Sequence, residues 1–237
     1  MALVLLSISF NGATSAQVFF GYNVKKVPIY SVETKEKQVA ISFDAAWGAD
    51  KTEDIMALCK EFNVNATFFL VGFWVDKYGD MVKKIHANGF EIGTHSKTHP
   101  DMTKLSRQSV KQELQDSVKL IEDLVDVKVK YFRSPYGAYN NALLEVADDL
   151  GLVTIQWDVD SLDWKGISGE TIANKVLSQV KNGSIILMHN NADNVLGGLR
   201  LILTRLKQLE YKVTSVGELV YTSNYVIDRN GKQISNK

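Results

Sequence analysis

Seven short apolar segments alternate with amphipathic segments along this chain, and this alternation restricts the possible folds more than any other feature. The apolar segments are β-prone and cover residues 38–43, 66–71, 90–94, 129–132, 153–157, 184–188 and 212–216. Apolar residues at helical spacing predict helices between them, over about residues 51–63, 75–87, 105–126, 140–150, 169–180 and 195–209. Strands that are apolar throughout and alternate with helices indicate a parallel sheet covered by helices. The pattern therefore predicts an α/β fold, either an open sheet or a closed barrel.

The domain organisation follows from the absence of any linker rich in Pro, Gly or Ser in the 237 residues. We expect a single domain over residues 38–221, an irregular lead-in over residues 17–37 and a polar tail over residues 222–237.

The 27 basic and 27 acidic residues cancel, and without a basic cluster this argues against nucleic-acid binding. The single cysteine, Cys59, leaves neither an intrachain disulfide nor a cysteine-based zinc site. Nothing in the sequence indicates a protein partner.

The N-terminal segment carries the signal for location. Residues 2–10 form an uncharged apolar run, and small residues follow it. The run is shorter than the roughly 20 residues of a membrane span. It fits the core of a secretory signal with cleavage after Thr14-x-Ala16, although no basic residue precedes Lys25. A buried strand and a membrane-anchor remnant are the alternatives for residues 1–16. We expect an exported protein, either cleaved or anchored.

Uncommon polar side chains stand directly after the predicted strands. They are Asp44 after the first strand, His95 and His99 after the third, Arg133 after the fourth, Asp158, Asp160 and Asp163 after the fifth, and His189 after the sixth. The carboxyl ends of strands in a parallel barrel meet on the face that carries catalysis. Three of the four histidines belong to this set. The sequence therefore predicts one polar site at this face.

Each of these side chains also has an ordinary structural explanation. His95 and His99 are four residues apart, which lets two neutral imidazoles share a metal, but solvated loop histidines have the same spacing. Asp44 could cap the following helix, and Arg133 could be a surface charge. Placed together, however, a guanidinium would hold the Asp44 carboxylate ionised. His189 suits a general acid if a carboxylate orients it.

Five ordered motifs resemble those of the polysaccharide deacetylases of the NodB-homology type, which form carbohydrate esterase family 4. They stand at residues 42–48 (SFDAAWG), 95–99 (HSKTH), 133–137 (RSPYG), 160–164 (DSLDW) and 187–189 (LMH). The resemblance spans about residues 38–220, and the first motif is similar to that of the sporulation-associated PdaB-like branch. It implies a single-domain, distorted (β/α)7 barrel with parallel strands, which agrees with the seven strands predicted above.

The resemblance also implies an activity, metal-assisted removal of N-acetyl groups by a hydrolase of carbon–nitrogen bonds other than peptide bonds. His95 and His99 would bind a divalent metal, usually Zn²⁺, with Co²⁺ or Ni²⁺ as alternatives. Asp44 would be the general base that takes a proton from water. Arg133 would keep that carboxylate charged.

On the other side of the implied substrate, His189 would protonate the departing sugar amine, and Asp163 would orient the His189 imidazole. Tyr136, Trp164 and Asp160 would contact the substrate. A backbone N–H near Tyr136 would stabilise the oxyanion, and Trp164 would wall the groove. The implied partner is an N-acetylated glycan. Peptidoglycan, in the cell wall or spore envelope, best suits an exported protein.

One departure from the family pattern bears on activity. The second Asp of the family's T-F-D-D-G motif, its third metal ligand, is Ala45 in this chain, and two histidines are one ligand short of the usual catalytic zinc site. Asp50 is a candidate substitute, Asp44 could itself ligate, or the metal would be weakly bound or absent. Asn190 is a smaller departure, because many members carry Asp there. Two functions therefore stay open: an active deacetylase of cell-wall glycan, or a weak or inactive relative that binds glycan as a structural or sporulation factor.

Overall fold

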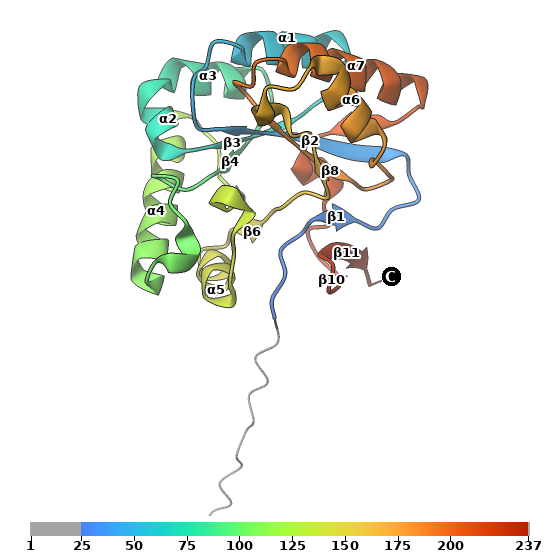
Figure 1. Ribbon diagram of the computed structural model, residues 1–237. Helices are drawn as coiled ribbons and strands as arrows, with labels where there is room; N and C mark the ends of the chain where they lie inside the picture. The colour runs from blue at the N-terminus through green and yellow to red at the C-terminus, as the bar shows by residue number, and fades with distance from the viewer. Residues whose placement is uncertain (1–24, 237) are drawn as a thin grey trace, which may run out of the picture.

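A curved sheet of parallel strands forms the centre of this computed structural model, which describes residues 25–236 (Figure 1). The strand order is β6-β5-β4-β3-β2-β8-β7, and β9 pairs with β2. Every pairing in this sheet is parallel. The strands are β2 (Gln38–Ala45), β3 (Thr67–Leu70), β4 (Glu91–Thr94), β5 (Tyr131–Phe132), β6 (Val153–Thr154), β7 (Val159–Asp160), β8 (Ile185–His189) and β9 (Lys212–Thr214). The predicted α/β class and distorted barrel of parallel strands are confirmed.

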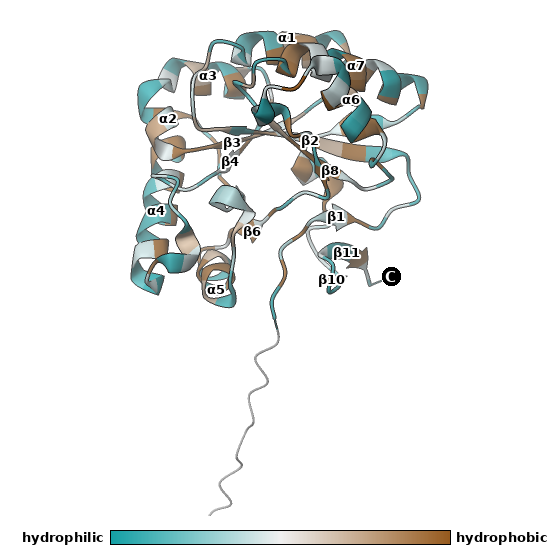
Figure 2. Cartoon of the chain, in the orientation of Figure 1, coloured by the Kyte–Doolittle hydropathy of each residue, from teal (hydrophilic) through white to brown (hydrophobic). Residues whose placement is uncertain are grey.

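Helices cover the outer face of this sheet (Figure 1). They are α1 (Thr52–Glu61), α2 (Gly72–Lys77), α3 (Gly79–Ala87), α4 (Arg107–Leu124), α5 (Asn141–Asp149), α6 (Gly169–Leu177) and α7 (Val195–Gln208). The short helix α8 (Val216–Leu219) instead packs against the inner face of the sheet, in one cluster with Ala40. Short 3₁₀ turns are η1 (Met102–Lys104), η2 (Pro135–Gly137) and η3 (Asp163–Lys165). Four of the α-helices begin at a side chain that accepts a backbone N–H of the first turn, namely Ser106, Asn140, Ser168 and Ser215. The strands are largely apolar, whereas the helices alternate between apolar and polar residues (Figure 2).

Alternation along β2 decides which of its side chains enter the barrel. Ile41 and Phe43 are buried in the core between sheet and helices. Ala40 belongs to the separate core inside the barrel, and Asp44 opens into a pocket at the barrel mouth. Because successive side chains of a strand point to opposite faces, Asp44 lies on the same inner face of β2 as Ala40. Ala45 is the last residue of β2 and is fully buried.

The barrel has a seam that the N-terminal segment fills. β6 and β7 are neighbours in sequence but lie at opposite edges of the sheet, so the chain between them crosses the gap. There the Ile29 N–H donates to the Thr154 carbonyl at 3.1 Å, and the Gln156 N–H donates to the Ile29 carbonyl at 2.7 Å. Of the strand predicted over 153–157, only Val153 and Thr154 pair as β6, and the next strand, β7, begins at Val159. The lead-in, expected to be irregular, is part of the barrel wall.

The C-terminal residues form a second, small sheet. β1 (Ser31–Val32), β11 (Lys232–Ser235) and β10 (Tyr225–Ile227) pair in that order. The side chain of Gln233 is fully buried, accepts the Tyr221 N–H at 2.8 Å and donates to the Tyr221 carbonyl at 2.7 Å. The segment over residues 222–237, expected as a polar tail, thus pairs with β1 and is anchored by a buried polar side chain.

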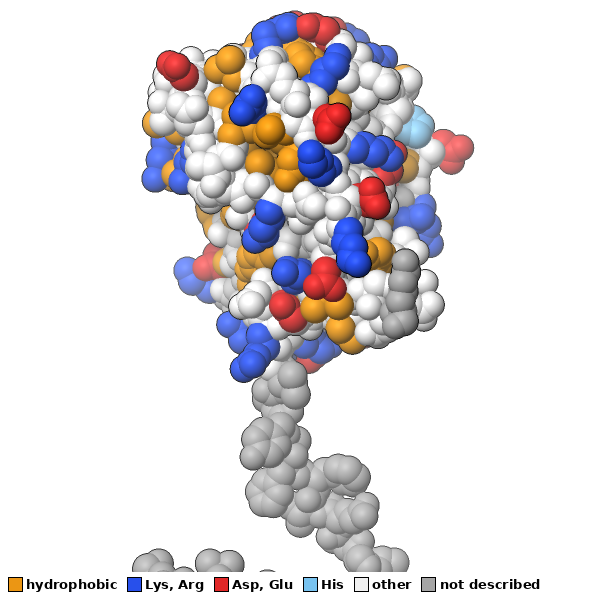
Figure 3. Space-filling model, turned by 90° about the vertical axis from the view of Figure 1, so that its right-hand side faces the viewer, with side chains coloured by type: hydrophobic (Ala, Val, Ile, Leu, Met, Phe, Trp, Pro, Cys, Tyr) orange, Lys and Arg blue, Asp and Glu red, His pale blue; other side chains and the backbone are white. Residues whose placement is uncertain are grey.

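The predicted leader over residues 1–16 lies outside the described residues. Within the described part of the chain, no helix combines the length and apolar character needed to cross a bilayer. On the face drawn in Figure 3, basic and acidic side chains are interspersed.

Candidate active site

The carboxyl ends of the strands open into a pocket with a volume of about 620 Å³. It is lined by side chains from all five motifs, among them Asp44, His95, His99, Tyr136, Asp160, Trp164 and His189. Arg133 and Asp163 are fully buried and are hydrogen-bonded to residues of this lining. The structure thus brings together every residue that the resemblance assigned to catalysis or substrate contact.

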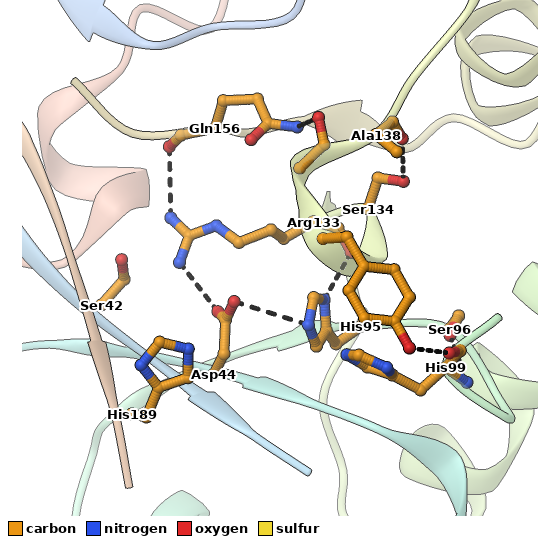
Figure 4. Close-up of polar contacts among 12 residues, drawn as sticks. Ser42, Asp44, His95, Ser96, His99, Arg133, Ser134, Ala138, Gln156 and His189 are labelled. Carbon is orange, nitrogen blue, oxygen red and sulfur yellow. Dashed lines mark hydrogen bonds and ion pairs between the residues drawn. The ribbon is translucent and has the colours of Figure 1, made fainter. Parts of the chain in front are cut away.

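The buried ion pair of Asp44 and Arg133 forms the base side of the pocket (Figure 4). Arg133 Nη1 donates to Asp44 Oδ1 at 2.8 Å, and Nη2 donates to the Gln156 carbonyl at 3.2 Å. The guanidinium lies 4.2 Å from the centre of the Phe69 ring and 5.5 Å from that of Trp157. Arg133 is fully buried rather than a surface charge. The stacked, hydrogen-bonded guanidinium therefore holds one oxygen of Asp44 in a fixed position.

The electrostatic environment keeps Asp44 ionised. Burial alone would raise the pKa of this carboxyl group, but the charge and hydrogen bond of Arg133 and the charges of His95 and His189 outweigh it and lower the pKa below its usual range. At neutral pH, Asp44 is therefore a carboxylate with one oxygen bound to Arg133 and the other, Oδ2, turned toward His95 (Figure 4).

His189 and Asp163 form the acid side. His189 Nδ1 lies 2.7 Å from Asp163 Oδ1, and the His189 N–H donates to Asp163 Oδ2 at 2.8 Å. Burial lowers the pKa of His189, but the hydrogen bond and charge of Asp163, with the charges of Asp44 and Asp160, raise it above its ordinary value. Because Nδ1 is bound to Asp163, Nε2 is the ring nitrogen left for the pocket. This imidazole is suited to donate a proton.

Replacing Asp163 by Asn tests this coupling. We expect the pKa of His189, followed by NMR titration of its imidazole, to lie above 6.5 in the wild type and to fall in Asp163→Asn, because burial persists while the carboxylate is lost. Protonation of His189 stabilises the wild type below the pKa of the unfolded chain, and this contribution is lost as pH rises through the folded pKa. The stability difference between the two proteins should therefore be larger at pH 5 than at pH 8. Asp193→Asn, at an exposed carboxylate of the rim, is the control, and equal titration of His189 in all three proteins would remove Asp163 from this role.

The two histidines that follow β4 lie side by side, with ring centres 4.9 Å apart. His95 Nδ1 lies 2.7 Å from the Arg133 carbonyl, which can only accept, so Nδ1 carries a proton. Burial lowers the pKa of His95, and burial with the charge of His95 lowers that of His99 to about 4. At neutral pH, His95 Nε2 is therefore an unprotonated acceptor that faces Asp44 Oδ2 at 3.4 Å. Two acceptors that face each other in a buried site would be stabilised by a cation bound between them.

The two histidines alone are nevertheless one ligand short of the usual catalytic metal site. Among residues 25–236, no group of three or more His, Cys, Asp or Glu is arranged to hold a metal ion. Ala45 is fully buried and brings only a methyl group, which cannot ligate a metal. Asp50 is exposed and is not among the residues that line the pocket. With its amide nitrogen turned toward Asp50, Asn191 donates to both carboxylate oxygens, at 3.0 and 3.2 Å. The position of Asp50 thus corrects the expectation that it replaces the missing ligand, because Asn191 holds it outside the pocket.

Backbone strain is concentrated in the motifs around the pocket. Ser96, His99, Tyr136 and Leu162 all have positive φ angles, of 70°, 57°, 61° and 52°. Residues other than Gly adopt this conformation at an energetic cost, which other contacts must offset. The Ser96 hydroxyl accepts the His99 N–H at 3.0 Å, and the Tyr136 hydroxyl lies 3.4 Å from the His99 carbonyl.

Sequence reasoning missed several residues of the site. Trp47 and Trp157 line the pocket with Trp164, so three of the four tryptophans of the chain surround it. Trp47 stands within the first motif, which was a usable signal. The backbone carbonyl of Gln156 accepts a hydrogen bond from Arg133. Such a contact does not depend on the side chain, so the residue type at position 156 does not predict it. Asp158, which the sequence grouped with the site, instead accepts the Ile185 N–H at 2.9 Å and holds β8.

Comparison with known proteins defines the class. The family model described as polysaccharide deacetylase matches residues 31–155, more than half of the chain. The chain therefore belongs to the polysaccharide deacetylase family, as the motifs indicated.

The most informative relatives come from bacilli. The chain is 35% identical to the uncharacterized protein YlxY of Bacillus subtilis over 81% of its own length and 60% of that protein. It is 31% identical to a peptidoglycan-N-acetylglucosamine deacetylase of Bacillus cereus, over 81% of this chain and 92% of the relative. Among solved structures, BA3943 of Bacillus anthracis, described as a CE4 family pseudoenzyme, is 34% identical with a TM-score of 0.79, over 81% of this chain and 68% of that one. A mutant of BA3943 described as having restored enzymatic activity is 35% identical with the same TM-score, over 81% of this chain and 71% of that one.

Proposed function

We propose that the protein binds an N-acetylated cell-wall glycan, namely peptidoglycan, in this pocket, and that it is a weak or inactive deacetylase as it stands. The observation that carries this proposal is the buried methyl group of Ala45 where the resemblance places a metal ligand. The hydrogen bonds of Arg133 to Asp44 and of Asp163 to His189 support the base and acid roles proposed for Asp44 and His189.

The residues present can perform the proton transfers of amide hydrolysis but do not supply positive charge at the acetamide oxygen. Asp44 is ionised and can accept a proton from water, and His189 can give a proton to a departing amine. A divalent ion would supply positive charge at the acetamide oxygen, and the described residues form no site with three ligands to hold it. We therefore expect the rate of hydrolysis to be limited by poor stabilisation of the charge on the acetamide oxygen, and not by the proton transfers.

The comparisons support this proposal from two directions. A similar deacetylase of Bacillus cereus is described as acting on peptidoglycan N-acetylglucosamine, which supports the choice of glycan. BA3943 is described as a pseudoenzyme, and one of its mutants as having restored activity. A member of this family at about this similarity can therefore lose its activity while it keeps the fold.

A second candidate is an active, metal-dependent deacetylase in which Asp44 becomes the third ligand of Zn²⁺, Co²⁺ or Ni²⁺. The separation of 3.4 Å between Asp44 Oδ2 and His95 Nε2 favours it. The same ligation would occupy the carboxylate that the first proposal uses as the base. Metal-dependent acetate release by the wild type separates this candidate from the first.

Where the protein acts follows from the glycan and forms part of the same proposal. A peptidoglycan ligand places the protein outside the cytoplasm, in the cell wall or spore envelope. The apolar run at residues 2–10 supports export, and the SFDAAWG motif supports a role in sporulation. Fractionation of cells and spores that carry the full chain tests both.

Glycan binding is tested directly at Trp164, which lines the pocket and is 59% exposed. Removing an aromatic ring that stacks on a sugar should lower affinity about 10-fold. We expect Trp164→Ala to weaken binding of the N-acetylglucosamine tetramer by that factor in calorimetric titrations of metal-free protein. Leu201→Ala, at an exposed apolar residue of α7, is the matched control and should leave affinity unchanged. If the wild type does not bind the tetramer, the proposed function is wrong.

A further inference from the structure

A row of aromatic rings continues beyond the pocket on the side of the first motif. His99 lies between Tyr136 and Trp47, with ring centres 4.7 and 5.2 Å from its own. Phe73, at the start of α2, lies 6.3 Å beyond Trp47. Phe73 is outside the set of residues that line the pocket. The row therefore extends from the two histidines out onto the open surface.

The outer rings of this row are available to a ligand. Trp47 is 63% exposed and Phe73 is 38% exposed. Neither residue is charged, and the described hydrogen bonds of the site use the side chain of neither. The catalytic assignments above leave Trp47 without a role, although it lines the pocket. Exposed aromatic rings next to a polar pocket match the apolar C–H faces of a sugar ring.

The loop that carries Trp47 is fixed before any ligand binds. The Gly48 carbonyl accepts the Trp74 indole N–H at 2.6 Å and the Asn190 amide at 2.9 Å. Asn190 also donates to Thr52 Oγ1 at 3.1 Å. A carboxylate at position 190 could not donate to the Gly48 carbonyl, so Asn190 suits this loop where Asp would not.

Phe73 is fixed in the same way. Its N–H donates to the Lys97 carbonyl at 3.1 Å, and the preceding Gly72 N–H donates to the Ser96 carbonyl at 2.9 Å. These bonds tie the start of α2 to the loop of the two histidines. A surface that is already rigid loses little conformational entropy when a ligand covers it.

We propose that Trp47, extended by Phe73, is a second sugar-binding surface that holds the ring next to the one whose acetamide enters the pocket. This inference rests on the proposed function and deepens it, because it makes the ligand an oligomer of N-acetylated sugars. Trp47 then sets preference for chain length and takes no part in proton transfer.

The test compares affinities for N-acetylglucosamine and for its tetramer, both measured by NMR titration of the full chain. In the wild type the tetramer should bind more tightly than the monosaccharide. In Trp47→Ala this ratio should fall about 10-fold, the effect of losing one stacked ring, because the tetramer loses more affinity than the monosaccharide. Trp47→Phe keeps a ring and should retain most of the ratio. Phe73→Ala should lower it by a smaller factor, and Leu201→Ala should not change it.

Three outcomes would overturn the inference. An unchanged ratio in Trp47→Ala would show that the tetramer does not reach Trp47. An equal loss of affinity for both sugars would show that Trp47 only supports His99. Absence of binding of either sugar by the wild type would instead overturn the proposed function, and the inference with it.

Discussion

Ala45→Asp should raise the affinity of the protein for Zn²⁺ by roughly 100-fold or more, since the loss of even an outer partner of a metal ligand costs 10- to 100-fold. The variant would add a carboxylate to the two histidines and complete a set of three protein ligands, the usual number at a catalytic zinc. Calorimetric titration with Zn²⁺ measures the change. Ala45→Asn has similar size but no charge, and should show little of the gain.

The same variant makes a distinctive prediction for stability. The side chain at position 45 is fully buried, so a carboxylate there should cost about 2–4 kcal/mol in metal-free protein. Bound Zn²⁺ should return about 2.7 kcal/mol at a concentration 100 times the dissociation constant. Urea unfolding with and without Zn²⁺ tests this recovery. If Ala45→Asp binds Zn²⁺ no better than the wild type and unfolds identically with and without it, the missing ligand is not what limits the site.

Arg133→Met should lower the free energy of unfolding by about 3–5 kcal/mol, because it leaves the buried Asp44 carboxylate without its partner. Met keeps an apolar side chain beside Phe69, so most of the loss comes from the charge. The unpaired carboxyl group should have a raised pKa. The deficit should therefore be present at pH 7 and shrink toward pH 4, where Asp44 becomes protonated.

Two further variants separate the ion pair from general effects of the substitution. Arg107→Met removes an exposed guanidinium that pairs with Glu145 at 2.7 Å, and it should change stability by less than about 1 kcal/mol. Arg133→Met combined with Asp44→Asn removes both buried charges and should recover much of the loss. A loss below about 1 kcal/mol in Arg133→Met would contradict the buried pair as described.

Much of the fold could be predicted because its signals are local. Strands such as β3 and β8 are apolar on both faces, and helices such as α4 carry one apolar stripe, so residue type alone marks them. The break between β6 and β7 was missed, because it depends on Ile29 pairing with Ile155 across the seam. The terminal sheet was missed for a similar reason, since Gln233 is polar and becomes buried only through Tyr221.

The site was predictable as a group of residues and less so in its contacts. Asp44, His95 and His189 follow different strands, and the parallel topology alone brings such positions together. The full burial of Arg133 depends on the Phe69 ring, whose position beneath it is a product of packing. The outward position of Asp50 depends in the same way on Asn191, far away in the sequence.

The measurement that tests the account most directly is acetate release from N-acetylated peptidoglycan fragments by the wild type and Ala45→Asp, each with saturating Zn²⁺ and with chelator. The account predicts release near the background rate for the wild type under both conditions, and release that depends on Zn²⁺ for Ala45→Asp. Rapid, chelator-sensitive release by the wild type would contradict it and establish that Asp44 and the two histidines are sufficient for an active metal site.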